Sequence, residues 1–436
     1  MAKPTCPPYL RPLLALFARN GERAYPVGGC VRDTLLGATP HDWDVAVTTD
    51  PETTMALCED AGYRTIPTGI KHGTVTVLLP LSGDPADREA PYEMVECTTC
   101  RTEGGYADGR HPDAVSFTGR IEDDLSRRDF TVNAMAFSGD GEDLAVVDLF
   151  GGRADLAAGI IRAVGDPDRR FSEDALRLLR AVRFAVRLGF AVEAETLAAM
   201  SRCAPGLARI SRERISDELS KILSGPDPLR GVAMLCETGL MPYVLPRGIS
   251  PLGAGDLPSL PAAYAPRLAC LQWGMSGEDV AENLRSLRLS NAIRRTVTLL
   301  TESAATPVIP TPREARVWRA VYGEEAELAL AVRLAQTAAV QTDAVQTAAA
   351  EQTESPTESE RERIRALAAM IRASEAAGEP VRIGDLALGG RELIALGVAP
   401  GPRVQALLQG LLELVWEDPA KNTPESLTKE ALSRKE

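Results

Sequence analysis

The chain is 436 residues long, and 48 basic against 61 acidic residues give it a formal net charge of −13. This length predicts two to four domains, and the composition is ordinary for a soluble globular protein. No run of about 18 apolar residues occurs, which argues against a membrane-spanning helix. We find no export signal, so we expect a cytoplasmic protein whose 8 cysteines are reduced.

The negative net charge does not exclude an RNA partner, because local patches determine where phosphate binds. Arginines are concentrated between Arg153 and Arg230, and the excess of acid lies largely elsewhere, including the stretch around Glu324 and residues 351–363. We therefore expect one basic face that binds RNA modestly and with strong salt dependence.

The first third of the chain mixes helical and strand signals, and from residue 151 onward the pattern is helical almost throughout. The prediction is an α+β head with a small mixed or antiparallel sheet, followed by all-α domains. The helices predicted in the head cover 13–18 and 51–61, and the predicted strands cover 24–27, 44–47, 74–79 and 92–98.

The most informative stretch runs from Gly28 to Asp44. Gly28 and Gly29 let the backbone approach a phosphate closely, because they carry no side chain. Arg32 can form a fork onto phosphate oxygens. Asp42 and Asp44 are separated by one residue, so in a strand both carboxylates lie on one face, where hard oxygen ligands suit Mg²⁺. A phosphate cradle beside a metal pair predicts nucleotidyl transfer, although either half alone is more typical of a turn or a solvated loop.

Four ordered motifs in the first half of the chain carry a resemblance to a known family. They are the stretch 28–44 and the segments 127–136, 173–185 and 210–215. Together they resemble the nucleotidyltransferase superfamily of DNA polymerase beta, and within it the class II tRNA nucleotidyltransferases (CCA-adding enzymes) and bacterial poly(A) polymerases. The resemblance implies a catalytic head (1–150), a helical neck for nucleobase recognition (151–225), a helical RNA-binding body (226–345) and a helical tRNA-binding tail (366–436). The low-complexity composition of residues 337–361, rich in Thr, Gln, Ala and Ser, predicts a flexible segment (346–365) or the end of an exposed helix.

Catalysis is assigned to acidic residues of the head. In two-metal phosphoryl transfer, one ion activates the attacking hydroxyl and the other supports the leaving pyrophosphate. Asp42 and Asp44 are the predicted Mg²⁺ ligands and catalytic residues. Glu96, on a neighbouring predicted strand, is the candidate third carboxylate, and an ordinary exposed strand residue is an equally weighted alternative. Gly29 and Arg32, with Gly28 before them, are expected to hold the triphosphate.

The segment 127–136 is similar to the second signature of the family. Arg127 and Arg128 are expected to contact nucleotide or phosphate. Asp129 and Asn133 are expected to brace the site. The alternative for two adjacent arginines is a solvated surface.

The segment 173–185 resembles the nucleobase-reading helix of the family. Ser172 is the predicted N-cap and Gly189 the predicted end of this helix. On one helix, Asp174, Arg177 and Arg180 would fall at i, i+3 and i+6, along roughly one side.

This spacing suggests how a base could be chosen without a template. Asp174 can accept a hydrogen bond from the exocyclic amine of C or A, and arginines can donate to base acceptors. G and U carry a carbonyl in place of that amine, which would leave Asp174 unpaired. Arg183 completes the series, either on the triphosphate or as a structural residue. The alternative for the whole pattern is a ladder of ion pairs on a helix surface.

The segment 101–110 is glycine-rich, as mobile loops are. It resembles the flexible loop that helps the family's active site accept its final nucleotide, and Arg101, Asp108 and Arg110 are its candidate residues. An ordinary hairpin excursion is an equally weighted alternative.

The resulting functional prediction is a magnesium-dependent enzyme that adds C, C and A to the 3′ end of tRNA from CTP and ATP and releases pyrophosphate. The alternatives within the same chemistry are a CC-adding or A-adding enzyme and a poly(A) polymerase. A further alternative is a non-catalytic RNA-binding protein on a transferase fold.

Overall fold

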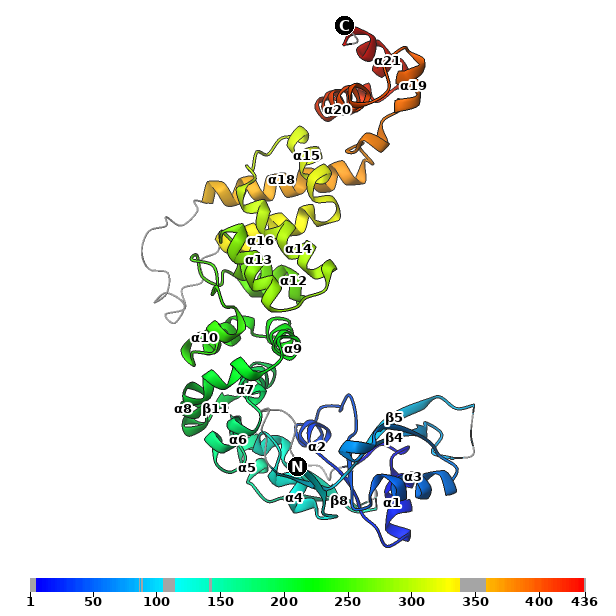
Figure 1. The fold of residues 1–436 in the computed structure, drawn as a ribbon, viewed down its shortest axis with the longest axis vertical. Helices are drawn as coiled ribbons and strands as arrows, with labels where there is room; N and C mark the ends of the chain where they lie inside the picture. The colour runs from blue at the N-terminus through cyan, green and yellow to red at the C-terminus, as the bar shows by residue number, and fades with distance from the viewer. Residues whose placement is uncertain are drawn as a thin grey trace. The chain divides into compact units, whose positions relative to one another are not determined.

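The computed structural model describes residues 5–85, 87, 89–104, 114–140, 143–337 and 358–434 (Figure 1). The chain forms two compact units. The first comprises Met1–Ile222 and Glu237–Tyr243, and the second comprises Leu223–Cys236 and Val244–Glu436. No helix in the described ranges is long and apolar enough to cross a membrane.

A five-stranded mixed sheet organises the start of the first unit. Its spatial order is β1-β2-β5-β4-β3, and only β2 and β5 run parallel. In that order the strands are β1 (Ala24–Pro26), β2 (Val45–Val47), β5 (Tyr92–Thr99), β4 (Thr74–Pro80) and β3 (Arg64–Gly69).

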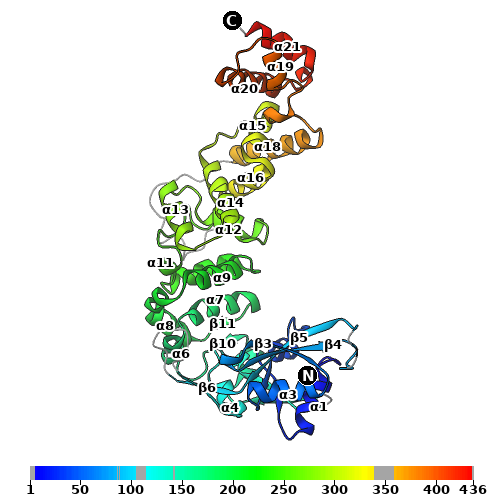
Figure 2. The ribbon, with the colours of Figure 1, turned by 45° about the vertical axis from the view of Figure 1, so that its right-hand side comes forward.

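Helices α1 (Arg11–Arg19) and α3 (Pro51–Asp60) lie together on one side of this sheet (Figure 2). Alternate residues of β5, Val95 and Cys97, are at most 1% exposed, whereas Met94 between Glu93 and Val95 is 65% exposed. This alternation follows from the period of two in a strand, which points neighbouring side chains to opposite faces. The second half of β5 therefore has one covered and one open side, whereas β1, β2 and most of β4 are buried throughout.

The four predicted strands are present, with one correction at the second. β2 begins at Val45, so Asp44 lies just before the strand rather than in it. The backbone of Asp44 is still tied to the sheet, because its carbonyl accepts a hydrogen bond from Val27 N at 2.9 Å. Strand β3 and three two-stranded pairings were not predicted. The paired strands are β6 (Arg101–Gly104), β7 (Ala114–Phe117), β8 (Met135–Ser138), β9 (Ala145–Asp148), β10 (Ile160–Ile161) and β11 (Ala191–Val192).

Short helices surround the sheet edge and lead into a helical region within the first unit. They are α2 (Gly29–Leu35), α4 (Ile121–Ser126), the 3₁₀ turn η2 (Thr131–Asn133), α5 (Gly152–Ala158), α6 (Pro167–Glu173), α7 (Leu176–Leu188), α8 (Ala194–Cys203) and α9 (Arg212–Leu223).

The predicted start of the base-reading helix was wrong. Two helices occupy this region, because Asp166 caps α6 by accepting a hydrogen bond from Arg169 N and is followed by Pro167 at the first helical position. Ser172 therefore lies inside α6 and is no N-cap. The prediction for the other end is confirmed: Gly189, at φ 70°, ends α7 in the left-handed conformation that glycine adopts readily.

The second unit is helical wherever it is described. One apolar cluster, which includes the fully buried Leu393, Leu411 and Leu427, holds its last three helices together. Its helices are α10 (Pro228–Glu237), α12 (Tyr264–Leu271), α13 (Gly277–Ser286), α14 (Asn291–Glu302), α15 (Pro312–Tyr322), α16 (Ala326–Thr337), α18 (Glu358–Ala376), α19 (Gly390–Ala395), α20 (Pro402–Glu417) and α21 (Pro424–Ser433), and α11 (Met241–Val244) straddles the two units.

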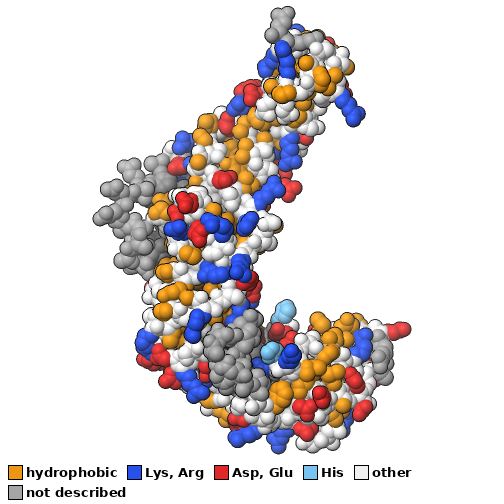
Figure 3. Space-filling view, in the orientation of Figure 1, with side chains coloured by type: hydrophobic (Ala, Val, Ile, Leu, Met, Phe, Trp, Pro, Cys, Tyr) orange, Lys and Arg blue, Asp and Glu red, His pale blue; other side chains and the backbone are white. Residues whose placement is uncertain are grey.

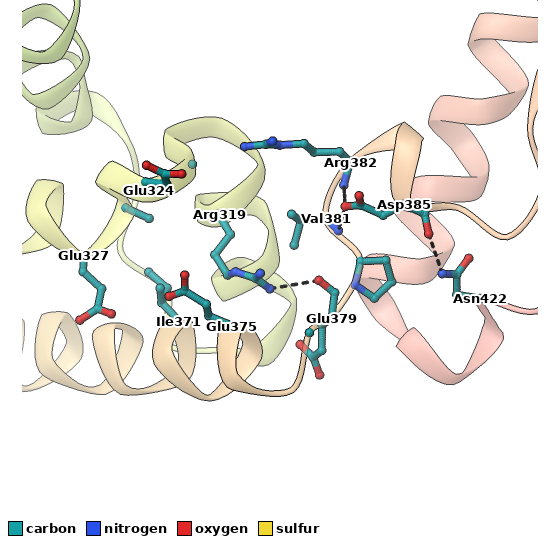
Figure 4. Close-up of a pocket in the computed structure, with 14 residues that line it drawn as sticks. Arg319, Glu324, Glu327, Ile371, Glu375, Glu379, Val381, Arg382, Asp385 and Asn422 are labelled. Carbon is teal, nitrogen blue, oxygen red and sulfur yellow. Dashed lines mark hydrogen bonds between the residues drawn. The ribbon is translucent and has the colours of Figure 1, made fainter.

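A cavity of about 450 Å³ lies where α15 and α18 meet the segment that leads to α19 (Figure 4). Its polar groups largely serve the fold: Arg319 donates to the carbonyl of Glu379 at 3.1 Å, and Asn422 donates to the carbonyl of Asp385 at 2.9 Å. Beside it, the buried Arg316 pairs with Glu379 at 2.8 Å. These contacts join the last helices to the rest of the second unit.

The position of Gly152 is closed to any larger residue. A Cβ added there would collide with the carbonyl oxygen of Thr131 and lie 2.8 Å from Met135 Cγ. We expect Gly152→Ala to lower the free energy of unfolding by about 1–3 kcal/mol, because overpacking forces the backbone of η2 to move. Thermal unfolding measures this. Gly277→Ala is the control, since nothing lies within 4 Å of its added Cβ. A wild-type unfolding midpoint for Gly152→Ala would contradict the prediction.

Candidate active site

A cavity of about 670 Å³ in the first unit brings together most of the predicted site residues. It is lined from α2, from the segment that precedes β2, from the segment between α4 and β8, and from α7 and α9. Its lining residues are Gly28, Gly29, Arg32, Asp33, His41, Asp42, Asp44, Arg127, Arg128, Asp129, Asn133, Asp174, Leu176, Arg177, Arg180, Arg183, Phe184, Arg187 and Arg214.

The glycine pair lies at the start of α2. Gly28 has φ 78°, a conformation that side chains disfavour, and a Cβ there would lie 2.6 Å from the guanidinium of Arg128. Arg32, one turn on, is 3% exposed and donates to Asn133 Oδ1 at 2.5 Å and to Asp33 at 2.8 Å. In this structure Arg32 thus links α2 to η2, and its role with a triphosphate stays a prediction.

The acidic pair is crowded. Burial, followed by the negative charge of Asp42 and then that of Glu96, raises the pKa of Asp44 to about 6, and Arg128 opposes the shift only in part. A divalent cation relieves such crowding, and carboxylate oxygens are the ligands that Mg²⁺ prefers. Within the described residues, no three His, Cys, Asp or Glu side chains form a metal-binding group. Asp42 and Asp44 offer two carboxylates, which fit an ion that completes its shell with phosphate and water oxygens.

Glu96 is next to this pair but does not line the cavity. It precedes Cys97, the residue of β5 that pairs with Val45 of β2, and its charge contributes to the raised pKa of Asp44. Its side chain is exposed. Its assignment as a third metal ligand stays a prediction.

Arg127 and Arg128 share one buried carboxylate that the sequence analysis missed. Asp124, 1% exposed, accepts from Arg127 Nε at 3.0 Å and from Arg128 Nη2 at 3.0 Å. Burial by itself would raise the pKa of Asp124, but the two arginines hold it below the usual value. The available signal was spacing, because Asp124 is three and four residues before the arginines. Asp124 orients both guanidinium groups toward the cavity.

Asp129 joins the second signature to α7. Its carboxylate accepts from Arg180 Nε at 2.8 Å, from Asn133 Nδ2 at 3.1 Å and from Phe130 N at 2.8 Å. Burial opposes ionisation, but Arg180 and the hydrogen bonds outweigh it and lower the pKa of Asp129 to about 2. Asp129 and Asn133 thus have contacts suited to bracing, while Arg180 already has a carboxylate partner.

The three residues predicted to share one side of a helix do not do so. Asp174 has φ −144° and ψ 103° and connects α6 to α7, so only Arg177 and Arg180 lie on a helix. Arg177 donates to Glu173 Oε2 at 2.8 Å and to the carbonyl of Arg127 at 2.9 Å. All three residues nevertheless line the cavity, and the ion pairs of the arginines are the contacts expected of the ladder alternative.

Phe184 is a second feature missed from the sequence. The guanidinium carbons of Arg32, Arg180 and Arg183 lie 5.4, 5.2 and 4.5 Å from its ring centroid. Aromatic faces attract cations at such distances. Arg183 also pairs with the buried Glu218 at 3.0 Å. An aromatic residue within an arginine-rich helix was the available signal, but its partners come from separate segments.

The predicted flexible loop is described only at its edges. Arg101 opens β6 and donates to the carbonyl of His72. Asp108 and Arg110 lie outside the described residues. Neither the loop interpretation nor the hairpin alternative is tested by these contacts.

Two family models match the chain. One is described as the poly A polymerase head domain and matches residues 24–162. The other is described as the probable RNA- and SrmB-binding site of polymerase A and matches residues 189–249. The first match spans the sheet and the acidic pair.

Known proteins match over nearly the whole chain. A CCA-adding enzyme of Limosilactobacillus fermentum is 37% identical over 432 residues, which are 97% of this chain and 95% of that one. A CCA-adding enzyme of Lactiplantibacillus plantarum is 41% identical over 295 residues, 66% and 68% of the two chains. The crystal structure of a Bacillus stearothermophilus CCA-adding enzyme, in complex with CTP, aligns with a TM-score of 0.74, 32% identity and 98% coverage of both chains. The fold, the acidic pair with its arginine-rich cavity, and this full-length similarity lead to one conclusion: the chain belongs to the family of CCA-adding enzymes, which are nucleotidyltransferases.

Proposed function

We propose that this chain adds C, C and A to the 3′ end of tRNA from CTP and ATP and releases pyrophosphate, with Mg²⁺ as its metal. The observation that carries the proposal is the joint lining of one cavity by Asp42, Asp44 and Asp174 with a row of arginines. Bond formation and base selection would then take place in one cavity. The CTP of the Bacillus stearothermophilus structure is consistent with this assignment.

The acidic pair would serve the transfer itself. Asp42 and Asp44 would hold Mg²⁺, which would supply charge stabilisation and help to activate the attacking hydroxyl. Gly28 lets the guanidinium of Arg128 lie close to the start of α2, because an added Cβ would be only 2.6 Å from Arg128 Nη1. Arg127 and Arg128 are held toward the same cavity by Asp124 and would bind the triphosphate. The 3′ hydroxyl of the RNA would attack the α-phosphate, and pyrophosphate would leave.

Base choice would rest on Asp174. An ionised carboxylate is an acceptor only, so it pairs with the amine of C or A and not with the carbonyl of U or G. Each good base contact discriminates by about 1–3 kcal/mol. Arg177, which lines the same cavity, would donate to base acceptors.

The surface charge is compatible with an RNA partner. On the face seen in Figure 3, Lys and Arg side chains of the second unit are interspersed with acidic ones rather than excluded by them. The tRNA contacts of this unit would therefore depend on local groups of basic residues, and binding would weaken steeply with salt.

Removal of the metal ligands tests the chemistry. We expect Asp42→Ala and Asp44→Asn each to lower CMP incorporation at least 100-fold, because the remaining carboxylate cannot hold the metal alone. Binding of tRNA, measured by filter retention, should stay at the wild-type level. Asp60→Asn is the control, since Asp60 is an exposed carboxylate at the end of α3 and does not line the cavity. More than a few per cent of residual incorporation by Asp42→Ala would rule out the assigned role.

Nucleotides supplied one at a time separate the full enzyme from its alternatives. With tRNA that lacks its terminal CCA, we expect incorporation from CTP alone, and after CC is present we expect a single AMP from ATP. Sequencing gels resolve both products. Use of CTP would exclude a poly(A) polymerase and an A-adding enzyme, whereas failure to use ATP after CC would overturn the proposal in favour of a CC-adding enzyme.

The raised pKa of Asp44 predicts pH-dependent metal binding. The pKa of Asp44 is about 6, so below that pH its carboxyl group is mostly protonated and a cation must displace the proton. The apparent Kd for Mn²⁺ should therefore rise roughly tenfold between pH 7 and pH 5, as measured by calorimetry. His41→Gln should retain this dependence, which would exclude the cavity histidine as its source. Equal affinities at pH 5 and pH 7 would contradict the prediction.

A further inference from the structure

Helix α9 contributes two side chains to the surroundings of the candidate active site. Arg214 and Glu218 are four residues apart, so they lie one turn from each other on the same side of the helix. Arg214 pairs with Asp174 at 2.8 Å, and Glu218 pairs with Arg183 at 3.0 Å. One face of α9 therefore holds Arg214, which lines the cavity, and the buried Glu218, which pairs with the lining residue Arg183.

The carboxylate of Asp174 depends on this contact because no helix fixes it. Its backbone is extended between α6 and α7. A neighbouring backbone group, Leu176 N, donates one hydrogen bond to Oδ1 at 3.0 Å. Arg214 donates the other hydrogen bonds, from Nη2 to Oδ2 at 2.8 Å and from Nη1 to Oδ1 at 3.4 Å. A fork of this kind sets the plane and direction of a carboxylate as well as attracting its charge.

We infer that Arg214 is a positioning residue for nucleobase selection, which acts by fixing the direction of the Asp174 carboxylate. This inference rests on the proposed reading of bases by Asp174. A fixed carboxylate accepts a hydrogen bond from the amine of C or A. It repels the carbonyl that U or G has in the same place, and both groups then stay unpaired, which is how a wrong substrate is rejected. A carboxylate held only by Leu176 could turn away from the carbonyl, so U would be tolerated while C is still bound.

The surroundings of Arg214 favour this role over a purely structural one. Its side chain is 24% exposed and that of Asp174 is 18% exposed, so the pair lies at the wall of the cavity and not in the core. Replacing a partly exposed pair should leave the fold intact. The same pair beside a bound base would be shielded from water and its geometry would decide which base fits.

The chain offers a matched control in α8. Arg202 also forks onto a carboxylate, with Nε 3.0 Å from Asp168 Oδ1 and Nη2 2.6 Å from Oδ2. This pair is about half exposed, and Arg202 does not line the cavity. Arg202→Met removes the same kind of contact at a distance from the proposed base.

The test is the ratio of kcat/KM for CTP to kcat/KM for UTP on tRNA that lacks its terminal CCA. We expect Arg214→Met to lower this ratio roughly tenfold or more, within the range of a lost base contact. Arg214→Lys should lower it as well, since an ammonium group keeps the charge but cannot form the fork. Arg202→Met should leave it at the wild-type value. A merely structural role would reduce both rate constants and leave their ratio unchanged.

The outcomes separate this inference from the proposed function. If Asp174→Ala lowers the ratio while Arg214→Met and Arg214→Lys keep the wild-type value, the role of Arg214 is overturned and the reading of bases by Asp174 stands. If Asp174→Ala keeps the wild-type ratio, base selection by Asp174 itself fails. Thermal unfolding of each variant confirms that it folds, and Arg214→Lys decides the question if Arg214→Met does not.

Discussion

Burial of several guanidinium groups around one cavity is the constraint on which the candidate active site depends. A buried charge without a partner costs several kcal/mol, so each guanidinium group needs a carboxylate close by. The structure supplies these carboxylates from different elements. The pairs are Arg127 and Arg128 with Asp124, Arg177 with Glu173, Arg180 with Asp129, and Arg183 with Glu218. The cavity therefore forms only when α4, α6, α7 and α9 pack together.

The acidic pair follows the opposite rule. Burial and the negative charges of Asp42 and Glu96 raise the pKa of Asp44. Arg128 acts in the opposite direction and lowers it. Carboxylates of the protein neutralise the arginines, whereas we propose that Mg²⁺ neutralises Asp42 and Asp44. The paired arginines thus stabilise the shape of the cavity, whereas the acidic pair suits the binding of a metal and a triphosphate.

The sequence predicted well what depends on local pattern. The strands β4 and β5 and the left-handed Gly189 follow from neighbours in the chain. The gathering of the glycine pair, the acidic pair and the arginines followed from the family resemblance rather than from local rules. The predicted start of the base-reading helix was wrong because Asp166 and Pro167 start a separate helix, α6, which includes Ser172 and ends at Glu173.

Contacts between distant segments could not be predicted in the same way. Asp174 and Arg214 are forty residues apart, and Arg180 and Asp129 are fifty-one apart, so no spacing rule joins them. The contact between Phe184 and Arg32 could not be predicted either, because Arg32 belongs to α2, far from Phe184 in the sequence. The resemblance named individual site residues, and the structure shows that Asp129, Asp174 and Arg180 each contact a partner from a distant segment. The sequence did not predict these partners.

The most direct test is a crystal structure of this chain with CTP and Mg²⁺. We expect Mg²⁺ to bind at Asp42 and Asp44. We expect the Asp174 carboxylate to lie within hydrogen-bonding distance of the exocyclic amine of cytosine and to keep its contact with Arg214. A metal bound elsewhere, or a cytosine edge that faces away from Asp174, would contradict the division of the cavity into a bond-forming part and a base-selecting part.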